Sequence, residues 1–137
     1  MSETVRTGRC FCGEVHYRVT GTPRTVCFCH CESCRRAAGA PNVVWATFPT
    51  ARFAVTEGRL TVHASSPDVE RGFCARCGTP VTYFHGARPT ELDVTVATLD
   101  DAHALKPQMH IWVDDKLPWV SIDDGLPAYG KFRSDDP

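Results

Sequence analysis

Two stretches of the chain decide its fold: Cys10-Phe11-Cys12-Gly13 and Cys74-Ala75-Arg76-Cys77-Gly78. Each carries a close pair of cysteines followed by a glycine, and glycine eases the tight backbone turn that such a pair needs. Zinc in structural sites takes four ligands in a tetrahedron, and thiolates are the commonest of them. The two pairs together therefore predict one closed zinc site on Cys10, Cys12, Cys74 and Cys77, which would tie the N-terminal strand to the middle of the chain.

A further group of cysteines lies between these pairs, in the run Cys27-Phe28-Cys29-His30-Cys31-Glu32-Ser33-Cys34. Cys29, Cys31 and Cys34 offer three thiolates for another metal, with no matched fourth cysteine elsewhere. A zinc ion with three protein ligands keeps a position for water or substrate, which marks catalytic sites. This second, incomplete site is the candidate active centre.

Cys27 leaves an alternative open, because it could be a fourth ligand that closes the second site. In an extended segment Cys27, Cys29 and Cys31 would all point to one face. A ligating loop seldom stays extended, so we favour Cys29, Cys31 and Cys34 as the complete set.

Eight cysteines are many for a chain of this length. Whether they form disulfides or bind metal depends on the redox state of the compartment. The start of the chain lacks an apolar signal core, and no apolar stretch reaches the ~18 residues that a membrane span needs. We therefore expect a cytoplasmic protein with no membrane partner. Lasting disulfides are rare in a reducing compartment, so metal ligation is favoured over disulfides.

Chain length indicates the number of domains, and net charge bears on the class of partner. The chain has 137 residues, which suits a single zinc-binding domain over 1–137. Lys and Arg number 15 against 16 Asp and Glu, a net charge of -1. Nucleic-acid-binding proteins usually show a basic patch or stripe, so no nucleic-acid partner is expected.

Alternation of apolar and polar residues with a period of two dominates the rest of the chain, which is typical of half-buried strands. The pattern predicts short strands within 15–19, 43–48, 53–55, 60–62, 81–83, 92–97 and 109–113. Glu57-Gly58-Arg59 would join two of them as a hairpin. Frequent glycine and proline breaks favour an antiparallel all-β domain.

Helical signals are weak. Ser33 to Ala38 could form a short turn of helix, and Asp100 to Leu105 another with Asp100 as its cap. The tail from Lys116 is expected to be a loop packed on the sheet by Trp119 and Tyr129.

The cysteine groups and their flanks resemble the glutathione-dependent formaldehyde-activating family, also called the centromere protein V family. The resemblance covers nearly the whole chain, and its motifs stand in the right order: Gly8-Arg9-Cys10-Phe11-Cys12-Gly13-Glu14-Val15, Cys29-His30-Cys31-Glu32-Ser33-Cys34-Arg35, Arg71-Gly72-Phe73-Cys74-Ala75-Arg76-Cys77-Gly78-Thr79, His110-Ile111-Trp112 and Lys116-Leu117-Pro118-Trp119.

The resemblance implies a β-tent zinc fold with two zinc ions per chain. One would be structural, on Cys10, Cys12, Cys74 and Cys77. The other, more labile, would sit on Cys29, Cys31 and Cys34. It also implies a carbon–sulfur lyase reaction, the reversible addition of a small-molecule thiol such as glutathione to an aldehyde.

Such a reaction needs a donor to the developing alkoxide, and the sequence does not single one out. His30 and His110 are candidates, although His30 fixed within the metal loop and His110 bonded to a backbone carbonyl are the simpler interpretations.

Binding residues are also open at this point. Arg35, Arg36 or Arg71 could bind the carboxylates of glutathione, whereas most arginines are simply solvated. The aromatic residues Trp45, Phe48 and Trp112 could wall a pocket, whereas aromatic residues more often pack in a core.

Three other functions compete with the enzyme. A non-catalytic zinc scaffold that binds another protein is the main alternative, and a closed second site would favour it. A nucleic-acid-binding role ranks next. A redox role would require the thiols of Cys31 and Cys34 to cycle rather than hold metal.

Overall fold

The structure is a computed structural model that describes residues 3–132, and strands dominate it. The predicted all-β class with short helical turns is confirmed. Every predicted strand is present within one or a few residues of its expected position. Three more strands, β1, β3 and β7, were not predicted, because their apolar residues are too few or their cysteines obscure the alternation.

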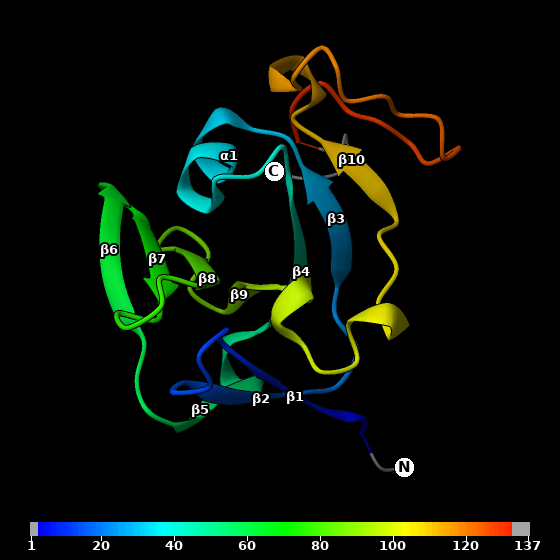
Figure 1. Ribbon diagram of the computed structural model, residues 1–137. Coiled ribbons are helices and arrows are strands. Elements are labelled where there is room, and N and C mark those ends of the chain that lie inside the picture. Colours follow the sequence, from blue (N-terminus) through cyan, green and yellow to red (C-terminus); the bar gives the residue numbers. More distant parts are fainter. Residues whose placement is uncertain (1–2, 133–137) are drawn as a thin grey trace.

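The strands form two sheets (Figure 1). The smaller sheet lies at the bottom of the view and has the antiparallel order β1-β2-β5. Its strands are β1 (Val5–Arg9), β2 (His16–Thr20) and β5 (Phe53–Glu57).

The larger sheet has seven strands in the order β10-β3-β4-β9-β8-β7-β6. Its members are β3 (Thr25–Cys29), β4 (Val43–Pro49), β6 (Thr61–Ser66), β7 (Val69–Phe73), β8 (Pro80–His85), β9 (Glu91–Thr95) and β10 (Met109–Ile111). Strand β10 runs parallel to β3, whereas all other pairs are antiparallel. The large sheet is therefore antiparallel, as predicted, except for this one parallel pair at its edge.

The predicted hairpin across Glu57-Gly58-Arg59 is wrong. Strand β5 pairs with β2 in the small sheet, and β6 pairs with β7 in the large one. The segment between them carries the chain from one sheet to the other. Leu60 lies there and packs against both the main core and the cluster around Cys10 and Cys74. The partly buried Leu60 therefore contacts both clusters at the point where the chain crosses between the sheets.

The main core lies between the two sheets. Its buried residues are Tyr17, Val19, Val26, Ala46, Phe48, Val81, Val94, Val96, Leu99 and Leu105. Because successive residues of a strand face opposite sides, the residues beside these core positions project from the other face of the large sheet. Cys27 faces Trp45 across β3 and β4, and Asp93 faces both Thr47 and Tyr83. The second face therefore carries a row of polar, aromatic and sulfur-bearing side chains.

Helices are short. α1 (Glu32–Ala38) confirms the predicted turn of helix, and Gly39 ends it. Four 3-10 turns complete the structure: η1 (Thr50–Arg52), η2 (Val96–Thr98), η3 (Ala102–Ala104) and η4 (Val113–Asp115). None of the helices within residues 3–132 has the length and apolar character to cross a membrane.

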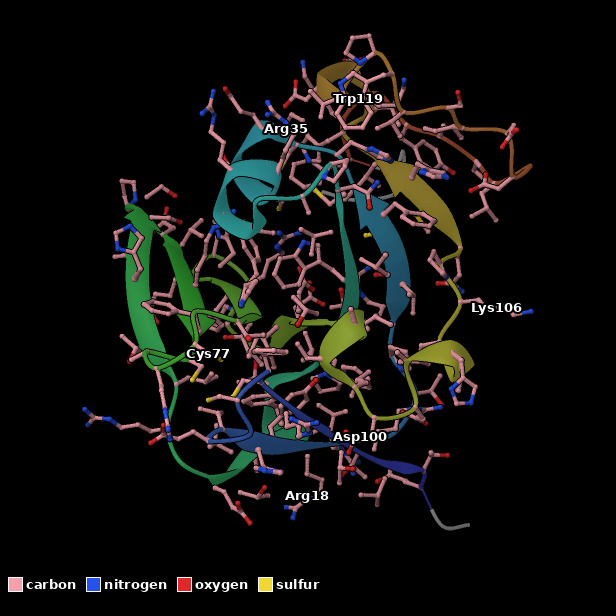
Figure 2. All side chains as sticks on the ribbon, in the orientation of Figure 1. Arg18, Arg35, Cys77, Asp100, Lys106 and Trp119 are labelled. Carbon is pink, nitrogen blue, oxygen red and sulfur yellow. The ribbon has the colours of Figure 1, made fainter. Side chains whose placement is uncertain are left out.

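Two local expectations need correction. Asp100 does not cap η3; its carboxylate instead accepts a hydrogen bond from the Thr7 hydroxyl at 2.6 Å. Trp119 does not pack on the sheet, because it is 70% exposed and lies at the edge of the molecule (Figure 2). The tail is held by its backbone instead, since the N–H of Tyr129 donates to the carbonyl of His110.

Candidate metal centres

Four cysteine sulfurs meet where the two sheets approach each other. Cys10 and Cys12 lie in the turn between β1 and β2, and Cys74 and Cys77 lie in the turn between β7 and β8. Figure 2 shows Cys77 at the base of the green strands, just above the blue hairpin of β1 and β2. All four sulfurs lie within 4.8 Å of one another.

In each turn, the N–H of the final glycine donates back to the carbonyl of the first cysteine, over three residues in one turn and four in the other. The N–H of Gly13 donates to the carbonyl of Cys10 at 3.2 Å, and the N–H of Gly78 donates to that of Cys74 at 2.7 Å. The φ angles of Gly13 and Gly78 are 81° and 80°, a region that glycine enters without steric cost. The glycines therefore let each turn fold back and present two sulfurs on one side.

The sulfur positions fit a tetrahedral metal. Zn–S bonds of about 2.3 Å imply sulfur–sulfur separations of roughly 3.8 Å in a regular tetrahedron. The Cys10 and Cys12 sulfurs are 3.7 Å apart, and the Cys12 and Cys74 sulfurs are 3.8 Å apart. These separations are far longer than a disulfide bond. The four-sulfur group could therefore hold one zinc ion.

Hydrogen bonds to the sulfurs favour the thiolate form that a metal requires. The backbone N–H of Val15 donates to the Cys10 sulfur at 3.3 Å. The Thr79 hydroxyl lies 3.1 Å from the Cys77 sulfur. Hydrogen bonding from this hydroxyl, supported by the backbone of Cys12 and Thr79, lowers the pKa of Cys77 to about 5.

A second group consists of three sulfurs, from Cys29, Cys31 and Cys34, which also lie within 4.8 Å of one another. Cys29 ends β3, Cys31 is the N-cap of α1, and Cys34 lies in the first turn of that helix. The N–H of Cys34 donates to the Cys31 sulfur at 3.2 Å, so the helix start itself fixes the position of that sulfur.

The Cys34 sulfur carries the negative charge of this group most readily. Hydrogen bonds from Cys29 and Cys31 lower the pKa of Cys34, and the nearby guanidinium of Arg71 lowers it further. The two terminal nitrogens of Arg71 lie 3.8 and 3.9 Å from the Cys34 sulfur. The same hydrogen bonds, together with burial, raise the pKa of Cys29.

The three-sulfur group borders a cavity of about 740 Å³, within the size range of small-molecule sites. Helix α1, the second face of the large sheet and the segment after β10 enclose it. Trp45 and Trp112 line this cavity, whereas Phe48 is buried in the main core and does not. Trp112 has a φ of 58°, an unusual value for a bulky residue and one that tends to cluster at functional sites.

Cys27 lies on the cavity wall but outside the three-sulfur group. It lies within β3, two residues before Cys29. Side chains two residues apart on a strand point to the same face, so Cys27 lies on the same face of the sheet as Cys29 but further from Cys31 and Cys34. Cys29, Cys31 and Cys34 are accordingly the three residues of this run whose sulfurs are grouped closely enough to hold one metal ion.

His30 and His110 lie away from the cavity, on the other side of the loop that follows β3, whereas His63 of β6 lines it. His30 Nε2 is 2.9 Å from His110 Nδ1, and His110 Nε2 is 2.7 Å from a carboxylate oxygen of Asp124. His30 and His110 are both buried, and neither lines the cavity in the part of the chain that the structure describes. The interpretation of His110 as bonded to a backbone carbonyl is wrong, because its ring bonds to two side chains. These contacts link the loop that follows β3 to β10 and to Asp124 in the C-terminal segment.

The three arginines differ in role. Arg36 lines the cavity rim and pairs with Glu32 at 3.2 Å on the exposed face of α1. Arg35 does not line the cavity, whereas Arg71 does and reaches the Cys34 sulfur.

Asp93 is a cavity residue that sequence reasoning missed. It stands between Leu92 and Val94 on β9, where alternation marked it as solvent-facing. Burial raises its pKa to about 6, although the Thr47 hydroxyl donates to it at 2.6 Å. An aspartate flanked by apolar residues of a central strand was the available signal.

The sequence profile of the glutathione-dependent formaldehyde-activating enzyme family matches residues 5–115, a span that contains both sulfur groups. The chain belongs to this family. One similar protein is an uncharacterized lyase of Schizosaccharomyces pombe, 34% identical over 86 residues. The alignment covers 60% of this chain and 61% of the yeast protein, so the chain spans less than two thirds of that relative's length.

A solved structure has a fold similar to that of this chain. A crystal structure of a Rhodobacter sphaeroides protein resembles it with a TM-score of 0.58 and 23% sequence identity. The match covers 90% of this chain and 98% of that protein. The likeness establishes a common fold for the two chains.

Proposed function

We propose that this protein is a zinc-dependent carbon–sulfur lyase that catalyses the reversible addition of a small thiol, such as glutathione, to an aldehyde. One observation carries the proposal: a group of three sulfurs, one short of a tetrahedron, opens onto a cavity large enough for a small molecule. Membership of the family and a relative named as a lyase support it.

The two sulfur groups would have different roles, one structural and one catalytic. Cys10, Cys12, Cys74 and Cys77 would hold a structural zinc that secures a single domain. Cys29, Cys31 and Cys34 would hold the catalytic zinc. A zinc ion at the three sulfurs would lower the pKa of an incoming thiol and keep it as the thiolate nucleophile at neutral pH.

The chain's own residues would prepare the cavity for addition. Trp45 and Trp112 present aromatic surface to the substrates, and Arg71 places a positive charge beside the sulfurs. The reaction joins the thiolate sulfur to the aldehyde carbon, and the electron pair of the carbonyl bond moves to oxygen. That oxygen then gains a proton and becomes the hydroxyl of the adduct. The reverse reaction removes this proton and expels the thiolate.

The rival scaffold function lacks a specific structural observation in its favour, since a purely structural second site would be closed. The test is to mix glutathione or a simpler thiol with a panel of aldehydes and follow adduct formation. Rates with the zinc-loaded protein should exceed the spontaneous rates, and chelation of zinc should remove the excess. Spontaneous rates across the whole panel, with two zinc ions bound, would favour the scaffold.

A further inference from the structure

Arg71 reaches the three-sulfur group from a distant strand of the large sheet. It lies on β7, opposite Tyr83 of β8. Its guanidinium carbon lies 5.0 Å from the centre of the Tyr83 ring, and its two terminal nitrogens lie 3.8 and 3.9 Å from the Cys34 sulfur. Stacking on the ring holds the planar guanidinium in one orientation, with its donors toward the sulfurs.

Charge explains why a cation is needed there. Three thiolates around one divalent cation leave a single net negative charge, and an incoming thiolate doubles it. The sulfurs of Cys29 and Cys34 are buried, so water screens this charge poorly. An anionic ligand would be repelled from the site unless a fixed positive charge offset the excess.

Other charged residues of the cavity do not meet this need. Arg88 lines the same cavity, but its guanidinium lies over the Phe132 ring at 5.9 Å. Arg36 pairs with Glu32 at the rim. Asp93 carries the wrong sign. Within residues 3–132, Arg71 is the cation whose side chain contacts a sulfur of the three-sulfur group, that of Cys34.

We infer that Arg71 is the anion-stabilising residue of the three-sulfur site, offsetting the charge of the thiolate that binds there and of the oxygen that becomes negative during addition. The inference rests on the proposed function for its second part only. A guanidinium has five N–H donors, so it can contact the sulfur and an oxygen at once.

The proton balance closes with water. The thiol releases its S–H proton to water when it binds as a thiolate. After the carbon–sulfur bond forms, the oxygen takes a proton from water, so no net proton is consumed. Arg71 keeps its own protons throughout and acts only through charge and hydrogen bonds.

The competing role for Arg71 is to bind a carboxylate of glutathione, and the choice of thiol separates the two. 2-Mercaptoethanol carries no carboxylate, so only an anion-stabilising arginine affects its binding. The experiment titrates cobalt-substituted protein with 2-mercaptoethanol and with glutathione, following the sulfur-to-cobalt absorption band without any aldehyde. The variants are Arg71→Gln, Arg71→Lys and the control Arg88→Gln.

Arg71→Gln should weaken 2-mercaptoethanol binding about tenfold or more, the usual effect of losing a charge-assisted hydrogen bond. Arg71→Lys should weaken it less, because the charge remains, and Arg88→Gln should leave it unchanged. If Arg71→Gln fails to fold or to load metal, Arg71→Met takes its place, because methionine keeps an apolar stem against Tyr83 but carries no charge.

Three results would overturn the inference: unchanged 2-mercaptoethanol binding in Arg71→Gln, weaker binding of glutathione alone, or an absence of thiol binding in wild type. Because no aldehyde is present, these results do not depend on turnover. Wild-type protein that binds thiol but accelerates no addition would count against the proposed function and leave the role of Arg71 intact.

Discussion

The Cys12 sulfur lies 3.8 Å from the Cys74 sulfur, although 62 residues separate the two cysteines in sequence. This contact joins the turn of the small sheet to a turn of the large one. The contact is too long for a disulfide and suits two ligands of one metal. The stability of the whole fold should therefore depend on it.

The first prediction concerns the four-sulfur group. Cys77→Ser should prevent folding or leave an unstable protein, because structural zinc binding contributes on the order of 10 kcal/mol, comparable to the whole stability of a domain. The measurements are soluble yield, zinc content and melting temperature. A soluble variant that melts like wild type would refute the structural role of this group.

The second prediction concerns the three-sulfur group. Cys31→Ser should remain folded but lose one zinc, since two thiolates hold zinc far more weakly than three. Any thiol–aldehyde activity should fall about 100-fold or more and should not recover at saturating thiol. Zinc content and rates are measured on the same samples, and equal activity in both proteins would exclude thiol activation at these sulfurs.

Cys27→Ser is the matched control and a prediction of its own. The Cys27 sulfur lies on the cavity wall but outside the three-sulfur group. The variant should therefore keep two zinc ions per chain. Loss of one zinc on this substitution would show that Cys27 is a ligand and that the second site is closed.

The fourth prediction uses Asp93. Its pKa is about 6 in the folded protein against an ordinary value of 3.8, so the folded state holds its proton more tightly. Ionisation of Asp93 therefore lowers stability as pH rises from about 4 through 6. Asp93→Asn keeps an acceptor for Thr47 and should be more stable than wild type by roughly 1–3 kcal/mol above pH 7, with little difference near pH 4.

Denaturant unfolding of zinc-loaded wild type and Asp93→Asn across this pH range measures the difference. The exposed Asp68 supplies the control, and Asp68→Asn should follow wild type at every pH. A constant offset between Asp93→Asn and wild type would contradict the raised pKa.

The fifth prediction concerns Asp124, whose carboxylate accepts a hydrogen bond from His110. This bond, with the backbone N–H of Leu126, lowers the pKa of Asp124 below 3.8. Its contribution to stability is thus complete above pH 4 and is lost as pH falls through the lowered value.

Asp124→Asn should therefore lower the melting temperature at neutral pH, and the gap from wild type should narrow in acid. Asp123→Asn, one residue earlier, is the control and should change little. A gap that stays the same from pH 7 to pH 3 would show that the ionised carboxylate is not what stabilises the loop.

Features that depend on neighbouring residues could be predicted from the sequence, whereas contacts between distant residues could not. The cysteine pairs and the alternation around Tyr17 or Val94 are local patterns, so the sulfur groups and most strands were found. The pairing of Phe53–Glu57 with His16–Thr20 is a long-range contact, and the local turn at Gly58 pointed to the wrong partner.

The residues of the cavity could not be predicted either, because distant strands bring them together. Asp93 and Tyr83 meet only because β8 and β9 pair in one register, and Arg71 reaches Cys34 from a distant strand. No spacing along the chain encodes these approaches. His30 and His110 stood out in sequence as the polar candidates, yet the parallel pairing of β10 with β3 turns both rings away from the cavity and toward Asp124.

The strand order affects how the protein folds while the ribosome synthesises it. At about 5–20 residues per second, Cys12 waits roughly 3–12 s before Cys74 is synthesised. Strand β9 sits between β4 and β8, so the early and late halves of the large sheet cannot join until residue 95 has emerged. Until Cys74 and Cys77 emerge, Cys10 and Cys12 lack two of the four sulfurs of their group, so their thiols stay open to oxidation. The group of Cys29, Cys31 and Cys34 lies within six residues and needs no later part of the chain.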